Sequence, residues 1–216
     1  MLHVGIIALA VVLLSVVLFA EKRENRALLV PSKGILSVLF VLTALTVSQA
    51  SSGYRVLLLW GLAFCLGGDV CLALPQRTMF LLGLISFLIG HGFYVVAFLG
   101  VGKAGIWTLG GGLLICGLSG WVYRWLSPHL GRMRGPVLAY ILVITAMVAC
   151  AWSVFERGDL PRGARILVLA GALCFYLSDI FVARDRFVKN AFLNRAVGLP
   201  TYYTAQFLLA FSTAVL

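Results

Sequence analysis

The chain has 216 residues, of which 62% are hydrophobic and 11% are charged, and its mean hydropathy is +1.06. A soluble domain has about 45–50% apolar and about 25% charged residues, so this composition excludes a soluble enzyme, a disordered tail and a small disulfide-stabilised domain. The net charge of +10 comes from short basic clusters between apolar runs. Such clusters are typical of loops that face anionic lipid headgroups, so we expect a membrane protein that binds no nucleic acid.

Apolar runs of about 20 residues, long enough to cross a bilayer as an α-helix, recur along the chain. In chain order they cover residues 2–20, 34–50, 54–74, 79–99, 106–126, 136–155, 164–183 and 197–216. Pro31 falls in an expected loop, and Pro200 lies near the start of the last run, where a first-turn proline is tolerated. The sequence therefore predicts an all-α fold: a single integral membrane domain over residues 1–216, built as a bundle of about eight transmembrane helices.

The distribution of Lys and Arg predicts how this bundle is oriented. Basic residues are concentrated in the first, third, fifth and seventh loops. The positive-inside rule then places these loops in the cytoplasm and both termini outside it, in a bacterial inner membrane. The first run has no basic residue before it and no small-residue cleavage signature after it, so we expect a first span and not a signal peptide.

Seven acidic residues are few enough to follow one by one. Five lie in expected loops, whereas Asp69 and Asp179 lie inside the third and seventh runs, at similar distances from their cytoplasmic ends. A carboxylate at membrane depth costs roughly 2.5–3.5 kcal/mol on insertion scales unless it faces a cavity or a partner. Two at one depth predict a shared cavity. The alternative is that each lies at the headgroup border beside an arginine such as Arg77 or Arg184.

The fourth and eighth runs carry further polar side chains. His91 and Tyr94 are three residues apart, as are Tyr203 and Gln206, so each pair shares a helical face. Tyr202 adds a hydroxyl to the eighth run. We expect these side chains to orient the carboxyl groups and water, although hydrogen bonds that merely join helices are the alternative for each of them.

The expected pocket opens toward a basic cytoplasmic boundary. Candidates for binding a phosphate headgroup there are Arg77, Arg184, Asn194 and Arg195. We expect no metal, because a catalytic zinc site needs about three ligands and the sequence has no His-x-x-x-His or Glu-x-x-His spacing, even though His91 and the two aspartates are enough in number. We expect no cofactor, and the sequence favours no particular oligomeric state.

The third and seventh runs resemble each other. Ala63-Phe-Cys-Leu-Gly-Gly-Asp69-Val is similar to Ala172-Leu-Cys-Phe-Tyr-Leu-Ser-Asp179-Ile, and a tyrosine follows each aspartate by 24 or 25 residues, at Tyr94 and Tyr203. Two parallel four-helix halves would produce this similarity, as would chance likeness between apolar segments.

These residues resemble the YhhN-like lysoplasmalogenase family of eight-span membrane proteins. The matching pieces are Gly68-Asp69 with Leu72, Gly83-Leu-Ile-Ser-Phe87 leading to His91 and Tyr94, Ser178-Asp179 followed by Phe187, and Tyr202-Tyr203-x-x-Gln206. The resemblance covers most of the chain. It implies that the substrate is a vinyl-ether lysophospholipid, hydrolysed to a fatty aldehyde and glycerophospho-ethanolamine or -choline, and it adds Ser178 to the expected site.

Two carboxyl groups suit this reaction. Protonation of the carbon β to the ether oxygen creates an oxocarbenium-like cation, to which water adds before the hemiacetal collapses. One protonated carboxyl would act as the general acid, while the other, ionised, would stabilise the cation and take a proton from water. The sequence does not divide these roles between Asp69 and Asp179. The alternatives are a proton-coupled transporter or lipid flippase, in which such carboxylates relay protons, and a metal-dependent amide or ester hydrolase of the membrane.

Overall fold

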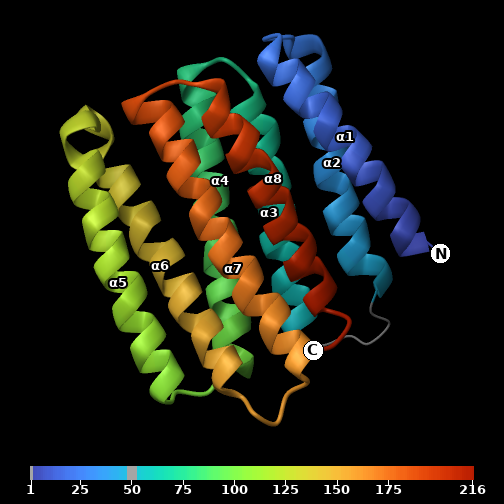
Figure 1. Ribbon diagram of the computed structural model, residues 1–216, viewed down its shortest axis with the longest axis vertical. Coiled ribbons are helices and arrows are strands. Elements are labelled where there is room, and N and C mark those ends of the chain that lie inside the picture. The colour runs from blue at the N-terminus through green and yellow to red at the C-terminus, as the bar shows by residue number, and fades with distance from the viewer. Residues whose placement is uncertain (1, 48–52) are drawn as a thin grey trace.

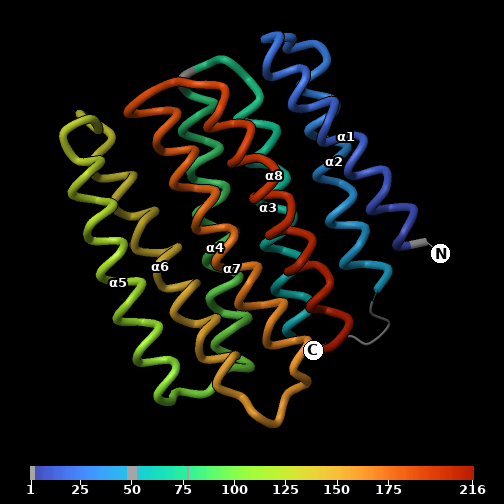
Figure 2. Tube along the Cα trace, viewed as in Figure 1, coloured from blue at the N-terminus to red at the C-terminus, as the bar shows by residue number. Residues whose placement is uncertain are grey.

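The computed structural model describes residues 2–47 and 53–216 (Figure 1). Within these ranges the chain forms eight long helices: α1 (Leu2–Lys22), α2 (Arg26–Val47), α3 (Gly53–Ala73), α4 (Arg77–Val101), α5 (Ile106–Leu126), α6 (Arg134–Glu156), α7 (Arg162–Ala183) and α8 (Phe192–Ser212). Short turns at Ser127–His129 and Gly131–Met133 join α5 to α6, and a π-helical turn at Arg184–Val188 extends α7. The described residues form no strand, so the predicted all-α fold is confirmed. Successive helices run in opposite directions, and α1 begins at the same end of the bundle at which α8 ends (Figures 1 and 2).

Seven of these helices, α1 to α7, are long and apolar enough to cross a membrane. The eighth, α8, has 21 residues but carries more polar side chains, and it packs against α7, α2, α1 and α3. The chain is thus a polytopic helical membrane protein, as the composition predicts. The end of the second expected span, residues 48–50, lies outside the described residues.

The starts of α2 and α8 differ most from the sequence-based expectation, and both differences involve proline. α2 begins at Arg26 and takes in Pro31, and α8 begins at Phe192, so that Pro200 lies in its interior. A proline removes one backbone donor and strains the preceding turn. In both helices the residue after the proline bonds back to the preceding turn: the Ser32 hydroxyl donates to the carbonyl of Leu28 (2.6 Å), and the Thr201 hydroxyl donates to that of Val197 (2.8 Å). Membrane helices tolerate an interior proline where Ser and Thr side chains and neighbouring helices adjust the local bonding.

The helices pack as two similar halves. The most extensive contacts join α3 to α4 and α7 to α8, and α1 packs on α2 as α5 packs on α6. Between the halves, α4 lies against α6 and α8 lies against α2. Most of these contacts are repeated four helices later, which is the arrangement expected of two parallel four-helix halves, although the contacts of α8 with α1 and α3 have no equivalent of similar extent at α4.

Glycines set the register of this repeat. A Cβ atom at Gly83 would lie 3.3 Å from the carbonyl oxygen of Gly68, and one at Gly198 would lie 3.7 Å from that of Ser178. The contact at Gly83 is tighter than a Cβ normally makes, whereas the one at Gly198 is an ordinary van der Waals distance; small residues at such positions let membrane helices approach closely. Since Gly68 and Ser178 directly precede Asp69 and Asp179, the two aspartates occupy equivalent positions in α3 and α7.

The same register pairs side chains of α4 with those of α8. Phe87 follows Gly83 by four residues and Tyr202 follows Gly198 by four residues, so these two rings are equivalent. By the same count Tyr94 corresponds to Leu209. The tyrosine spacing seen in the sequence is therefore not part of the structural repeat.

Candidate active site

A cavity of about 450 Å³ opens at the end of the bundle where α1, α3 and α7 end. Asp69 and Asp179 both line it, together with Tyr140 and Tyr202. Its volume lies within the range of small-molecule sites, about 300–1,000 Å³. Basic side chains also line the cavity: Arg26, Lys33, Arg186, Lys189 and Arg195. The two intramembrane carboxyl groups therefore share one space that is charged and large enough for part of a lipid.

Asp69 is enclosed by three helices and is only 2% exposed. Its Oδ2 atom accepts hydrogen bonds from the hydroxyls of Ser37 on α2 (2.6 Å) and Tyr202 on α8 (2.7 Å). Lys33 lies one helical turn before Ser37, is 5% exposed, and acts on Asp69 through its positive charge. Two hydroxyl donors and a buried cation thus surround this carboxyl group.

A chain of hydrogen bonds leads from α4 to Asp69. The Tyr94 hydroxyl donates to Oε1 of Gln206 (3.0 Å), and Nε2 of Gln206 donates to the Tyr202 hydroxyl (3.0 Å). Tyr202 in turn donates to Asp69. Because each group donates in the same direction, the chain orients the Tyr202 hydroxyl toward the carboxylate.

Asp179 is half-buried and has a simpler environment. Its Oδ2 atom accepts a hydrogen bond from the Tyr140 hydroxyl on α6 (2.7 Å). The Tyr140 ring packs edge-to-face against His91, with ring centroids 5.3 Å apart. Nδ1 of His91 lies 2.6 Å from the carbonyl oxygen of Phe87, so Nδ1 carries the proton and donates. His91 therefore packs against the ring of Tyr140 and helps to hold that ring in place.

The six residues expected to orient the carboxyl groups and water fall into three groups. Tyr202 lines the cavity and contacts Asp69, while Tyr94 and Gln206 act on Asp69 through Tyr202. The other three are buried away from the cavity lining: His91 bonds to the backbone of α4, Ser178 donates to the carbonyl of Phe175, and Tyr203 packs on Tyr202 at 4.9 Å.

Sequence reasoning missed Lys33, Ser37 and Tyr140. Lys33 was assigned to a loop because α2 was expected to begin after it, and hydroxyl residues in apolar runs are common. A usable signal was present, since Lys33 and Ser37 are four residues apart and share a face of α2.

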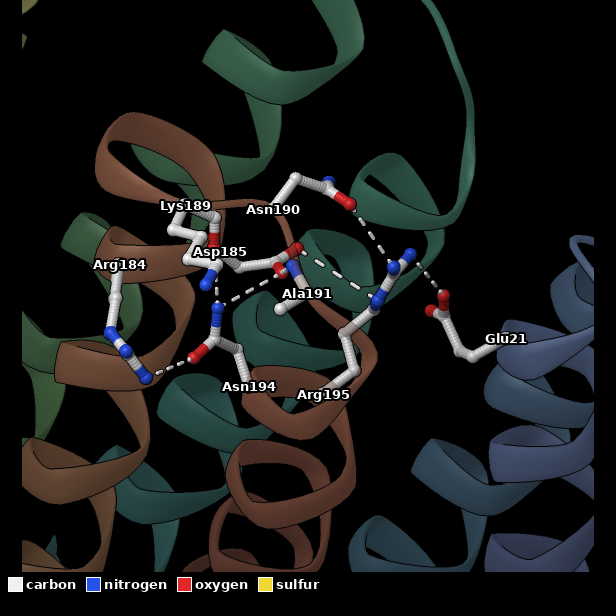
Figure 3. A network of polar contacts seen from close by, with 8 residues as sticks. All are labelled: Glu21, Arg184, Asp185, Lys189, Asn190, Ala191, Asn194 and Arg195. Carbon is white, nitrogen blue, oxygen red and sulfur yellow. Dashed lines mark hydrogen bonds and ion pairs between the residues drawn. The ribbon is translucent and has the colours of Figure 1, made fainter.

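Of the four headgroup candidates, Asn194 and Arg195 line the cavity, and Figure 3 shows them together with Arg184. Arg184 donates to Oδ1 of Asn194 (2.9 Å) and does not line the cavity. Asn194 lines it and ties the turn between α7 and α8 together through Asp185 (3.3 Å) and the carbonyl of Lys189 (2.7 Å). The Arg77 side chain lies outside the described part of the structure.

Arg195 links three parts of the mouth. Its guanidinium lies 3.4 Å from Glu21 at the end of α1 and 3.9 Å from Asp185, and it donates to Asn190 (3.3 Å). Arg184, one of the two arginines in the headgroup-border alternative, bonds to Asn194, and no ion pair among the described side chains joins it to Asp69 or Asp179. The alternative with Arg77 stays a prediction, because that side chain lies outside the described part of the structure.

Metal ligands are not grouped in the part of the chain that the structure describes. No three His, Cys, Asp or Glu side chains there come together in a way that could hold a metal ion. The described lining of the cavity offers two carboxyl groups, the hydroxyls of Tyr140 and Tyr202, and basic side chains.

Fold and cavity together define the class: a polytopic helical membrane protein with two carboxyl groups at one end of the bundle. Residues 28–213 match the sequence model of the YhhN family. The match takes in most of the chain, and the chain belongs to this family. No solved structure matches it.

Several relatives carry a functional name. Bovine lysoplasmalogenase TMEM86A is 34% identical over 154 residues, 70% of this chain and 62% of the relative. Mouse lysoplasmalogenase TMEM86B is 35% identical over 167 residues, covering 76% and 66%. A Mycobacterium tuberculosis protein named lysoplasmalogenase is 30% identical over 174 residues, covering 78% and 63%. This chain thus spans about two thirds or less of these relatives' own length.

Proposed function

We propose that this protein is a membrane-embedded lysoplasmalogenase. It would hydrolyse the vinyl ether bond of a lysoplasmalogen to a fatty aldehyde and glycerophospho-ethanolamine or -choline. The observation that carries this proposal is the placement of Asp69 and Asp179 on one cavity. Family membership and the names of the relatives agree with it.

The proposed chemistry uses the two carboxyl groups as a pair. A protonated carboxyl gives its proton to the carbon β to the ether oxygen, which leaves an oxocarbenium-like cation. The ionised carboxyl stabilises this cation and removes a proton from the attacking water. Inside a membrane these charges are screened less than in water, so an anion aimed at the developing cation has a large effect.

The lining of the cavity suits an amphiphile. Arg195 and Lys189 stand at its mouth, where they would bind the lipid phosphate, and apolar residues such as Leu84 and Ile144 line it further in. The basic mouth also fits the positive-inside rule, so we propose that the cavity opens to the cytoplasmic leaflet of a bacterial inner membrane, with both termini outside the cytoplasm.

A lipid panel tests the activity. Purified protein in detergent is incubated with vinyl-ether, alkyl-ether and acyl lysophospholipids, and the products are identified by mass. We expect aldehyde from the vinyl ether alone, since only that bond is opened by protonation at carbon. A folded protein that releases no aldehyde would overturn the proposal, and movement of intact lipid across liposomes would favour a transporter instead.

Substitution of the carboxyl groups tests the mechanism. We expect Asp69→Asn and Asp179→Asn each to lower kcat by about 10²–10⁴-fold, the usual contribution of an acid or base. The matched control is Asp159→Asn, at the opposite end of the bundle in the loop after α6 (Figure 1). The Arg157 guanidinium, 2.6 Å away, lowers the pKa of Asp159 to about 2, so Asp159 is a permanently charged carboxylate far from the cavity. Its substitution should leave aldehyde release unchanged.

A further inference from the structure

Asp69 and Asp179 are equivalent in the repeat but have unequal partners. On each side a hydroxyl of the preceding even-numbered helix donates to the carboxyl: Ser37 of α2 to Asp69 and Tyr140 of α6 to Asp179. Asp69 accepts a second bond from Tyr202, at 2.7 Å. For Asp179, Tyr140 is the donor that the described side chains provide.

The two halves carry different residues at two equivalent positions, and these differences produce the unequal surroundings of the two aspartates. The position of Tyr202 in α8 is occupied in α4 by Phe87, which has no hydroxyl, and the two rings meet edge-to-face with centroids 5.8 Å apart. Lys33, four residues before Ser37, supplies a buried cation near Asp69, whereas the residue four positions before Tyr140 is Pro136. Asp69 thus has two groups that have no counterpart beside Asp179 among the described side chains, the Tyr202 hydroxyl and the positive charge of Lys33.

We propose that this asymmetry fixes the roles of the two carboxyl groups: Asp69 is the ionised partner and Asp179 carries the catalytic proton. The inference rests on the proposed function and assigns the parts within it. Burial by itself disfavours a charge more strongly at Asp69, which is 2% exposed, than at the half-buried Asp179. At Asp69 two hydroxyl donors and a nearby cation oppose that cost, whereas Asp179 has one neutral donor and no such cation among the described side chains, so its carboxyl group is kept uncharged. Tyr202 and Lys33 are then positioning residues that act through Asp69.

With these roles, the catalytic cycle returns both carboxyl groups to their starting protonation states. Asp179 gives its proton to carbon β, the π electrons of the double bond form the new C–H bond, and an oxocarbenium cation remains beside Asp69. Water bonds to the cationic carbon and loses a proton to Asp69, which gives a neutral hemiacetal. Asp179 then takes the hemiacetal hydroxyl proton while Asp69 returns its proton to the glycerol oxygen as the C–O bond breaks. One water is consumed, and both carboxyl groups recover their starting states.

A matched pair of variants tests the roles. Tyr202→Phe and Tyr140→Phe each remove one hydroxyl that donates to one carboxyl and keep the ring. The readout is the pH dependence of kcat/KM for aldehyde release, whose acidic limb reports loss of the required anion and whose alkaline limb reports loss of the required acid. Ser37→Ala, which removes the other donor to Asp69, serves as a second variant on that side.

Tyr202→Phe and Tyr140→Phe should shift opposite limbs of the pH profile of kcat/KM. We expect Tyr202→Phe and Ser37→Ala to shift the acidic limb upward by about one pH unit, because a hydrogen bond to a charged group is worth about 1.5–3 kcal/mol and one unit corresponds to 1.36 kcal/mol. Tyr140→Phe should shift the alkaline limb upward and leave the acidic limb in place. The reverse pattern, or no shift in either variant, would overturn the assignment while the proposed function stands.

Infrared spectroscopy gives a readout that needs no turnover. At neutral pH the wild type should show the carbonyl stretch of a protonated carboxyl, which Asp179→Asn abolishes and Asp69→Asn retains. Loss of the band in Asp69→Asn alone would overturn the assignment. A wild type that releases no aldehyde but shows the expected band would overturn the proposed function and leave the asymmetric protonation standing.

Discussion

At the scale of single residues, Lys33 is the most unusual feature of the site. A lysine that is 5% exposed within a membrane bundle is expensive unless an opposite charge compensates it. Lys33 and Asp69 both line the cavity, and the positive charge of Lys33 favours the ionised form of Asp69 against the cost of burying that carboxyl group. Removal of either charge therefore leaves the other less compensated.

We expect Lys33→Met to lower kcat by tenfold or more, because Asp69 then gains a proton more readily and the anion needed beside the cation is lost. Methionine keeps the length and the apolar stem of lysine, so packing is changed little. Steady-state aldehyde release measures the effect. Lys103→Met is the control, since Lys103 is an exposed lysine in the loop between α4 and α5. Equal activity of Lys33→Met and wild type would contradict a role for Lys33 at Asp69.

The sequence predicted the two aspartates because a carboxylate in an apolar run is conspicuous on energetic grounds. It did not predict Ser37 and Tyr140, because a hydroxyl costs little in a helix and gives no signal of what it faces. His91 was expected to orient water, yet its Nδ1 bonds to the backbone of its own helix. Which face of α4 turns toward the cavity depends on packing between distant helices, and hydropathy carries no information about that.

At the scale of helices, glycines decide how closely α3 and α4 approach. Gly90 on α4 faces the backbone of α3, and a Cβ there would lie 3.0 Å from the carbonyl oxygen of Gly61 and 3.1 Å from Sγ of Cys65. Gly92, two residues on, would place a Cβ in open space. A substitution by alanine would thus meet the α3 backbone at Gly90 and open space at Gly92.

We expect Gly90→Ala to destabilise the protein by about 1–3 kcal/mol, because a backbone oxygen cannot move aside as a flexible side chain can. For a chain of this size this corresponds to a fall in Tm of about 2–4 °C per kcal/mol. Gly92→Ala should leave Tm unchanged or raise it, since alanine is favoured over glycine in a helix by about 1 kcal/mol. Thermal unfolding in detergent measures both. A similar Tm for the two variants would show that α3 and α4 are packed more loosely than described.

Hydropathy predicted the central part of each helix more accurately than its first and last residues. The apolar runs predict α5 at its observed bounds, but the rule that proline marks a loop misplaced the start of α2. α2 continues through Pro31 while it packs against α1, α3 and α8. A membrane helix tolerates proline where it packs against neighbouring helices, and a rule based on residue type alone does not register that packing.

At the scale of the whole molecule, polarity is concentrated at one end and on one helix. The cavity lies where α1, α3 and α7 end, and its mouth carries the basic cluster at the turn between α7 and α8. α8 is the least apolar long helix because its polar side chains, among them Asn194, Tyr202 and Gln206, face inward against the other helices. A bundle of this kind presents its cavity to one leaflet, and the positive-inside rule predicts that this is the cytoplasmic leaflet.

Fusion reporters test this orientation. Because α1 begins and α8 ends opposite the basic mouth, we expect a reporter attached after Leu216 to lie outside the cytoplasm. An alkaline phosphatase fusion there, which requires an oxidising compartment, should be active, and a cytoplasmic fluorescent reporter should be dark. The internal control is insertion of the same reporters at Asn190 in the turn between α7 and α8, where the pattern should reverse. Activity of the phosphatase at Asn190 would place the cavity mouth on the outer side, and the lipid substrate would then have to enter from the outer leaflet.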